Sequence, residues 1–570
     1  MANEAGRMRA RGLGWMAWLV LAIAWFATVQ IRPMFDPDEG RYAEIPREMA
    51  VTGDWLTPRF DGLKYFEKPP LQYWATAAAY SVFGEHEWTS RLWTVALAFA
   101  CLPMVFGWTR RLYGRNAALG AIAALCVSPY FGIVGHLNLL DAAFSFWLTG
   151  AVFAFALAQS AAVGSQDERR WMLVAWVAAA LAILSKGIVV GVLAGTSLLI
   201  YSVIERDLRP WKRLHAAIGV PLFLLVGAPW FVAVSLRNPD FAEFFFIHEH
   251  FARFLTTVHQ RVEPWWFFLP LLLLGVFPWG LAAIRAPLYA WHDKGPTPHF
   301  KPLRFLLIFS LFTLVFFSMS GSKLAPYIQP MFPPLAAIVG VWAAERATFM
   351  RNTAVITASL VAFVGFGLLI YSAIHNSFIP QGAIVWTTLG TALMLAAVLI
   401  ARARQRPGEV VPAGDSLADS PLGISSLTAR SRSVAPAVAI AAAGAFAWQA
   451  FMTALGIVPP ARSARELVAE TQPYVHPQTA LYSVGQYRET ISPYLHRTLT
   501  LVDFEGELHF GLQAEPGRQM ATPEDFVSRW NSSSDAVAFF GPRLWEQFRQ
   551  RGLPGRVIAA DTYTVVVSRS

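Results

Sequence analysis

The sequence predicts a polytopic α-helical membrane protein that ends in a small soluble α/β domain. Of the 570 residues, 55% are hydrophobic and only 15% are charged, whereas soluble domains carry roughly 25% charged residues. Apolar runs of about eighteen residues or more recur along the chain, and each is long enough to cross a bilayer. From about residue 459 onward, the composition becomes that of a soluble protein.

The first apolar run, residues 13–31, follows three closely spaced arginines. Basic residues stay on the cytoplasmic side of a membrane, so we expect the following segment, 32–88, to emerge on the outer side. This first loop is too polar to span, and its two amphipathic patterns, at 38–50 and 64–82, predict helices lying along the interface.

Twelve further spans bring the predicted total to thirteen. The clusters of lysine and arginine fall in the loops that this alternation places inside, as the positive-inside rule requires, so the net charge of +9 indicates topology and no nucleic-acid partner. The predicted spans are 89–109, 116–135, 139–161, 171–186, 188–204, 215–236, 264–284, 303–320, 326–344, 353–373, 382–401 and 434–457.

We therefore divide the chain into a transmembrane catalytic domain, 1–458, and an outer α/β domain, 459–570. An outer loop at 237–263 and a Pro-, Gly- and Ser-rich inner linker at 405–433 belong to the first domain. In the second domain, we expect strands at 479–484, 499–504, 535–540 and 563–568 and helices at 461–471, 523–531 and 542–551.

Ionisable side chains gather at the outer ends of the spans. The densest group is the stretch 35–44, Phe-Asp-Pro-Asp-Glu-Gly-Arg-Tyr-Ala-Glu, immediately after the first span. Charge of this density at a membrane boundary predicts a site, to which other outer segments add side chains. The candidates are Asp38, Glu39, Arg41, Tyr65, Glu67, Lys68, Asp141, Lys186, His248, Arg253, Lys323 and Tyr327.

Each group also has a plainer interpretation. Lysines at helix ends, Lys186 among them, are commonly interface anchors, and Glu39 and Glu44 could lie on a solvated helix face. Asp141 is harder to dismiss, because a carboxylate within an apolar span costs about 2.5–3.5 kcal/mol on insertion scales. The run Phe244 to Phe246 is better explained by packing than by sugar binding.

A metal site is a further alternative. His248 and His250 are two residues apart, so on a helix they point in different directions and only one would face a given pocket. A divalent cation such as zinc would then need a carboxylate from another loop, for example Glu67. A neutral, hydrogen-bonded histidine is the competing interpretation, and no cofactor follows from these residues alone.

The segment Met319 to Pro330 combines a glycine, two prolines, Lys323 and Tyr327 at the outer end of a span. A broken backbone at membrane depth is tolerated where it lines a cavity. A lysine and a tyrosine there predict a site for an anionic lipid headgroup.

These motifs together resemble the GT-C superfamily of membrane glycosyltransferases. The 35–44 stretch, the block Tyr-Phe-Glu-Lys-Pro-Pro-Leu at 65–71 and the pattern Ser-Lys-Leu-x-x-Tyr-x-x-Pro at 322–330 resemble the bacterial lipid A aminoarabinose transferases, relatives of the protein O-mannosyltransferases. The likeness covers the whole chain, including thirteen spans and a C-terminal outer domain.

The resemblance implies that 4-amino-4-deoxy-L-arabinose moves from undecaprenyl phosphate to lipid A phosphates at the periplasmic face of the inner membrane. This modification lowers the negative charge of the outer membrane and so confers resistance to polymyxin. Asp38 would be the catalytic acidic residue, with Glu39 and Asp141 in support. Arg41, Lys68, Arg253, Lys323 and Tyr327 would contact the donor phosphate, together with Tyr65 and Lys186, and His248 is preferred over His250 on the same resemblance.

Two other functions stay open on the sequence. One is a GT-C enzyme with another sugar or a protein acceptor, and the other is a transporter of lipid-linked sugars. A transporter is expected to place ionisable residues near the bilayer midplane and often contains inverted repeats. Here the charges gather at outer ends and no repeat is visible, which favours an enzyme.

Overall fold

The structure is a computed structural model. It describes residues 15–252, 263–277, 279–344, 346, 451–452, 462–504, 506–518, 520 and 522–569. Outside these residues lie Arg253, the linker 405–433 and nearly all of the last three predicted spans.

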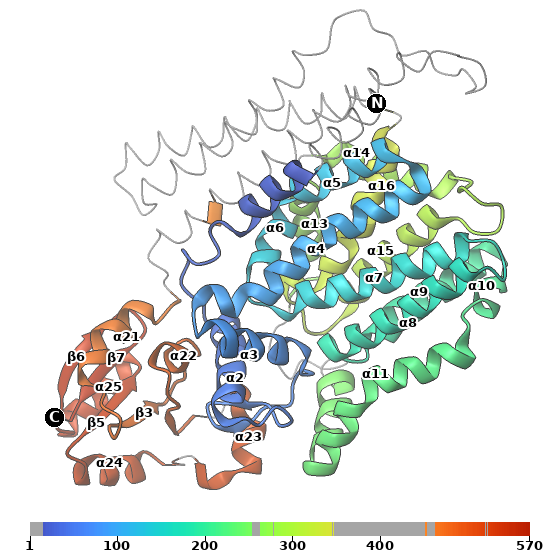
Figure 1. The fold of residues 1–570 in the computed structure, drawn as a ribbon. Coiled ribbons are helices and arrows are strands. Elements are labelled where there is room, and N and C mark those ends of the chain that lie inside the picture. Colours follow the sequence, from blue (N-terminus) through green and yellow to red (C-terminus); the bar gives the residue numbers. More distant parts are fainter. Residues whose placement is uncertain are drawn as a thin grey trace, which may run out of the picture.

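The membrane part is a bundle of helices, drawn from blue through green to yellow in Figure 1. Five of its described helices are long and apolar enough to cross a bilayer, and the bent pair α5 and α6 would make a sixth. The helices are a helix Trp15–Phe26, α4 (Glu87–Tyr113), α5 (Arg115–Cys126), α6 (Pro129–His136), α7 (Leu140–Ser160), α8 (Gln166–Lys186), α9 (Val189–Glu205), α10 (Arg209–Lys212), α11 (Ala216–Arg237), η1 (Glu243–Ala252), α13 (Phe268–Val276), α14 (Gly280–His292), α15 (Pro302–Met319), η2 (Ala325–Met331) and α16 (Phe332–Ala344).

Two predicted single spans are interrupted, and a third is continuous but begins as a tighter helix. The span 116–135 bends by 64° between α5 and α6, where the Ser128 hydroxyl caps α6 by accepting from the Phe131 N–H and Pro129 occupies the first turn. The span 264–284 divides into α13 and α14 after the extended Phe277, the residue before a proline. The span 326–344 begins as the 3₁₀ turn η2 before α16.

The first loop folds into the helix α2 (Asp38–Thr52), a short hairpin of β1 (Arg59–Phe60) and β2 (Leu63–Lys64), and the helix α3 (Leu71–Phe83). Most of α2 is buried, whereas the amphipathic pattern predicted a helix lying along the interface. The second predicted helix begins later than residue 64, because the Pro-Pro pair that precedes α3 favours extended backbone in the residues before it.

The C-terminal domain is built around one five-stranded sheet in the order β4-β3-β5-β7-β6. β3 pairs in parallel with β4 and β5, whereas β7 runs antiparallel to β5 and β6. The strands are β3 (Ala480–Val484), β4 (Thr500–Val502), β5 (Ala536–Phe540), β6 (Arg556–Ala560) and β7 (Val565–Ser568), and the helices are α21 (Arg465–Thr471), η3 (Gln472–Tyr474), α22 (Ile491–Leu495), η4 (Gly506–Leu508), α23 (His509–Ala514), η5 (Pro516–Arg518), α24 (Pro523–Ser532) and α25 (Pro542–Gln550).

The structure contains the four strands and three helices predicted here, but β6 was missed. This edge strand is mostly exposed, so its sequence lacks the apolar alternation by which a half-buried strand is found.

The C-terminal domain covers the first loop, with α22 and α23 lying beside α2 and the β1–β2 hairpin (Figure 1). The Asp36 carboxylate accepts a hydrogen bond from the Thr490 N–H at 2.8 Å, and the Asp61 carboxylate accepts from the Leu499 N–H at 2.8 Å. Where Gly40 faces Glu489, a Cβ atom on the glycine would lie 2.5 Å from the Glu489 carbonyl carbon. This close approach explains why α2 is buried.

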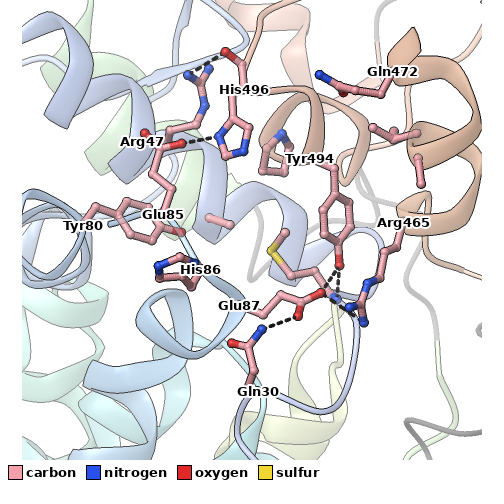
Figure 2. A pocket seen from close by; sticks show the side chains of 15 residues that line it. Gln30, Arg47, Tyr80, Glu85, His86, Glu87, Arg465, Gln472, Tyr494 and His496 are labelled. Carbon is pink, nitrogen blue, oxygen red and sulfur yellow. Dashed lines mark hydrogen bonds and ion pairs between the residues drawn. The ribbon is translucent and has the colours of Figure 1, made fainter. Parts of the chain in front are cut away.

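A pocket of about 340 Å³ lies in the seam between the two parts. Figure 2 shows polar side chains meeting across it: the Tyr494 hydroxyl donates to Glu87 at 2.8 Å, and His496 contacts Glu85. The predicted site residues that are described line other parts of the protein. We interpret this pocket as part of the joint that docks the C-terminal domain.

Candidate active site

The first group of predicted site residues surrounds the Arg41 guanidinium, on the second turn of α2. Its side chain is only 3% exposed. Arg41 Nη1 donates to the Asp38 carboxylate at 3.2 Å, and the Tyr65 ring centroid lies 5.9 Å from the guanidinium carbon. Asp38 is 34% exposed. The group thus combines a buried cation with a carboxylate that a substrate can reach.

Glu507 of the C-terminal domain completes this group, and the sequence analysis assigned it no role. Arg41 Nε donates to Glu507 Oε1 at 3.0 Å, and Nη2 donates to Oε2. Burial raises the pKa of Glu507, as do the charges of Glu67 and Asp38, while Arg41 lowers it. The pairing spans 466 positions of sequence, so no local pattern could have indicated it.

Glu39, the neighbour of Asp38, points into a different environment. Its carboxylate accepts from Arg32 at 2.5 and 2.7 Å, from Arg91 at 3.0 and 3.2 Å, and from the Asn138 N–H at 2.9 Å. Burial by itself would raise the pKa of Glu39, but the two guanidinium groups hold it well below its usual range. The carboxylate is 2% exposed. The predicted catalytic role stays a prediction, while these contacts join α2 to α4 and to the end of α6.

Lys68 stands at the second group, directly before the Pro-Pro pair. Its ammonium donates to the Glu67 carbonyl oxygen at 2.9 Å and lies 3.4 Å from the Glu249 carboxylate. Glu249 belongs to η1 and its side chain is 1% exposed. Through its charge, Glu67 also raises the pKa of Tyr65 and of Glu507. The Lys68 and Arg41 groups therefore share one electrostatic environment.

His248 lies near the same segment, with Nδ1 3.5 Å from the Glu249 carboxylate and its ring stacked on Phe244. Among the described residues, no three His, Cys, Asp or Glu side chains gather closely enough to hold a metal, and catalytic zinc sites commonly use three protein ligands. Metal binding by Glu67 and His248 stays a prediction, and no chemical step below depends on it.

The third group lies between helices α7 and α8. The Lys186 ammonium donates to the Asp141 carboxylate and stands 4.4 Å from the centroid of the Tyr327 ring on η2. The side chains of Lys186 and Asp141 are 11% and 9% exposed. The carboxylate inside an apolar span thus has a cationic partner, as the cost of an isolated charge at that depth requires.

Lys323 is held by backbone oxygens. Its ammonium donates to the carbonyl oxygens of Glu263 and Ser320, at 2.9 and 2.8 Å, and its side chain is buried. The broken segment predicted at 319–330 is present as a turn followed by η2. We find Lys323 fixing this turn to the segment before α13, and its predicted contact with the donor phosphate stays a prediction.

Two family descriptions match the chain. Residues 17–245 match the dolichyl-phosphate-mannose-protein mannosyltransferase family, and residues 467–569 match the aminoarabinose transferase C-terminal domain. The crystal structure of ArnT from Cupriavidus metallidurans in the apo state is 30% identical, with a TM-score of 0.85 over 99% of this chain and 98% of that chain.

This chain belongs to the aminoarabinose transferase family. A member from Sodalis glossinidius, named an undecaprenyl phosphate-alpha-4-amino-4-deoxy-L-arabinose arabinosyl transferase, is 33% identical over 64% of this chain and 68% of its own length. A relative of the same name from Pseudomonas paraeruginosa is 36% identical, and the matched stretch spans 59% of its length. Family membership confirms both the resemblance drawn from the three motifs and the predicted fold class of a multi-pass membrane protein with a C-terminal α/β domain.

The aminoarabinose transferase ArnT from Cupriavidus metallidurans has also been solved bound to undecaprenyl phosphate, again with 30% identity and a TM-score of 0.85. This likeness covers 98% of both chains. The two parts of the present chain therefore occur together, in the same arrangement, in a family member that binds a polyprenyl phosphate.

Proposed function

We propose that this protein transfers 4-amino-4-deoxy-L-arabinose from undecaprenyl phosphate to a phosphate group of lipid A at the periplasmic face of the inner membrane. The observation that carries this proposal is the nearly full-length likeness to the ArnT structure bound to undecaprenyl phosphate. The grouping of Arg41, Lys68 and Tyr65 at one end of the bundle supports it, because a leaving polyprenyl phosphate needs cations and hydrogen-bond donors.

In the proposed reaction, an acceptor phosphate oxygen attacks the anomeric carbon of the sugar and displaces undecaprenyl phosphate, with inversion. Arg41 and Lys68 stabilise the negative charge that develops on the leaving phosphate. Both side chains are largely buried, at 3% and 16% exposed, and buried charges interact more strongly than charges in water.

Asp38 is the carboxylate best placed to meet the reacting groups, because it is the more exposed partner of Arg41. An acceptor phosphate is already anionic, so a general base is less necessary than it would be for a hydroxyl nucleophile. We assign Asp38 to orienting the acceptor and stabilising positive charge at the anomeric carbon. The Asp141–Lys186 pair lies next to Tyr327, and we assign it a supporting role for the donor.

The decisive experiment gives purified protein in lipid vesicles the aminoarabinose carrier and lipid A, and measures the mass added to lipid A. We expect transfer by the wild type and none by Asp38→Asn or Lys68→Ala, at normal protein levels. Lys64→Ala is the matched control, since it removes a lysine from the same segment outside the Arg41 and Lys68 groups. Transfer only from another polyprenyl-linked sugar would replace the proposed substrate, and near-normal activity in both variants would refute the site.

A further inference from the structure

The Arg41 guanidinium, which we propose contacts the donor phosphate, is already paired with two carboxylates. Glu507 occupies its Nε and Nη2 edge in the bidentate arrangement that guanidinium groups form with carboxylates and phosphates alike. Asp38 takes a third N–H, on Nη1. With the side chain only 3% exposed, a phosphate cannot reach this edge while Glu507 remains on it.

The negative charges around Arg41 favour replacement of Glu507 by a phosphate. They disfavour the binding of a phosphate in addition to the two carboxylates. Glu507 already lies within the influence of two further carboxylates, Glu67 and Asp38, whose charges oppose its own ionisation. A phosphate entering beside all three would add to this repulsion. If the phosphate instead replaces Glu507, it takes over the same edge of Arg41. The total negative charge around the guanidinium then changes little.

A second observation points to a ligand at the same place. The Tyr65 hydroxyl is buried and has no hydrogen-bond partner among the described residues, although its ring lies beside Arg41. A buried polar atom without a partner is destabilising. A phosphate has oxygens to accept from both groups, whereas the Glu507 carboxylate accepts, within the described part of the chain, from Arg41.

We propose that Glu507 is a displaceable substitute for the donor phosphate on Arg41. This inference rests on the proposed function, because it takes the donor to be a polyprenyl phosphate. Binding of the donor breaks the Arg41–Glu507 pair and releases the η4 segment from α2, so that occupancy of the donor site is transmitted to the C-terminal domain.

Other described contacts between the two parts are made by other side chains, so the domain stays docked when this pair opens. Asp36 and Asp61 accept backbone hydrogen bonds from Thr490 and Leu499. A second ion pair, Arg59–Glu515 at 2.9 Å, also joins the first loop to the segment around α23. Its carboxylate is 18% exposed, against 19% for Glu507, which makes Glu515 a matched control.

The test measures binding of undecaprenyl phosphate, without sugar, to the purified full chain in lipid nanodiscs. Glu507→Gln keeps the size of the side chain but removes the competing charge. We expect it to bind at least about tenfold more tightly than the wild type, since the Arg41 edge is then no longer held by a competing charge; tenfold corresponds to about 1.4 kcal/mol. Glu515→Gln is expected to bind like the wild type, and Glu507→Asp, which retains the charge on a shorter side chain, is expected to fall between.

Unchanged or weaker binding by Glu507→Gln would overturn the proposal, with Glu507→Asp deciding the matter if the glutamine variant fails to fold. Equal tightening by Glu515→Gln would also overturn it, because the effect would then come from loosening the domain as a whole. A folded wild type that does not bind undecaprenyl phosphate would instead remove the proposed donor site itself, and the role of Glu507 with it. The two failures are therefore distinguishable.

Discussion

Glu39 and Asp38 are neighbours in the acidic motif, and the structure predicts opposite consequences for their amide variants. Glu39→Gln leaves the guanidinium groups of Arg32 and Arg91 buried side by side without an anion between them. Both arginines are almost fully buried, and breaking a buried ion pair by removing one partner costs about 3–5 kcal/mol. We expect Glu39→Gln to lose about this much stability, because its amide oxygen is neutral and its NH₂ group turns donors toward the two guanidinium groups.

The assay is thermal unfolding of purified protein in one detergent, followed by tryptophan fluorescence, with transfer activity measured in parallel. Asp38→Asn, whose carboxylate is 34% exposed, is expected to melt close to the wild type while losing transfer. Glu39→Gln is expected to melt well below it, and any folded fraction should retain activity. A Glu39→Gln protein as stable as the wild type but inactive would refute this reasoning and restore the catalytic role predicted from the sequence.

Two further outcomes concern the joint between the first loop and the C-terminal domain. Burial raises the pKa of Asp61 from 3.8 to about 8 in the folded protein. The protonated carboxyl therefore stabilises the fold fully below pH 3.8, its pKa in the unfolded chain. This stabilisation falls by about 1.4 kcal/mol per pH unit as the pH rises from 3.8 to about 8, and it is lost above that pH. Asp61→Asn, which tolerates the φ of 53° found there, should flatten this part of the pH dependence of the apparent melting temperature, and an unchanged slope would contradict the assignment. Gly40→Ala should lower the melting temperature, because overpacking against Glu489 costs about 1–3 kcal/mol. Gly107→Ala, with open space around the added Cβ atom, should not lower it. Equal melting temperatures of the two variants would contradict the close approach of Gly40 to Glu489.

Much of the architecture could be predicted because hydropathy and charge act locally along the chain. Apolar runs marked α4, α7, α11 and α15, and the acidic motif marked the loop at which the site begins. The interruption within 116–135 was not predicted, because a Ser-Pro pair inside an apolar run lowers its mean hydropathy only slightly. The bend depends on capping and on a missing N–H, and both are invisible to a hydropathy window.

The sequence predicted which residues belong to the site, but it did not predict all of the contacts between their side chains. Side chains of successive residues on a helix point about 100° apart, and the i,i+3 spacing of Asp38 and Arg41 puts these two on one face, but the sequence does not say that Glu39 turns toward Arg32 and Arg91. The pairing of Asp141 with Lys186 joins two helices across 45 positions. Glu507 could not have been found, because no motif distinguishes it within the C-terminal domain.

The C-terminal domain contributes directly to the structure around the candidate active site. Asp36, Arg41 and Asp61 are charged or ionisable groups of the first loop that are buried or largely buried, and each takes a hydrogen-bonding partner from the C-terminal domain. Buried charges without such partners are strongly destabilising, so the partners from the C-terminal domain help to hold α2 in this conformation. Since α2 carries Asp38 and Arg41, the geometry of the candidate active site depends on both parts of the chain.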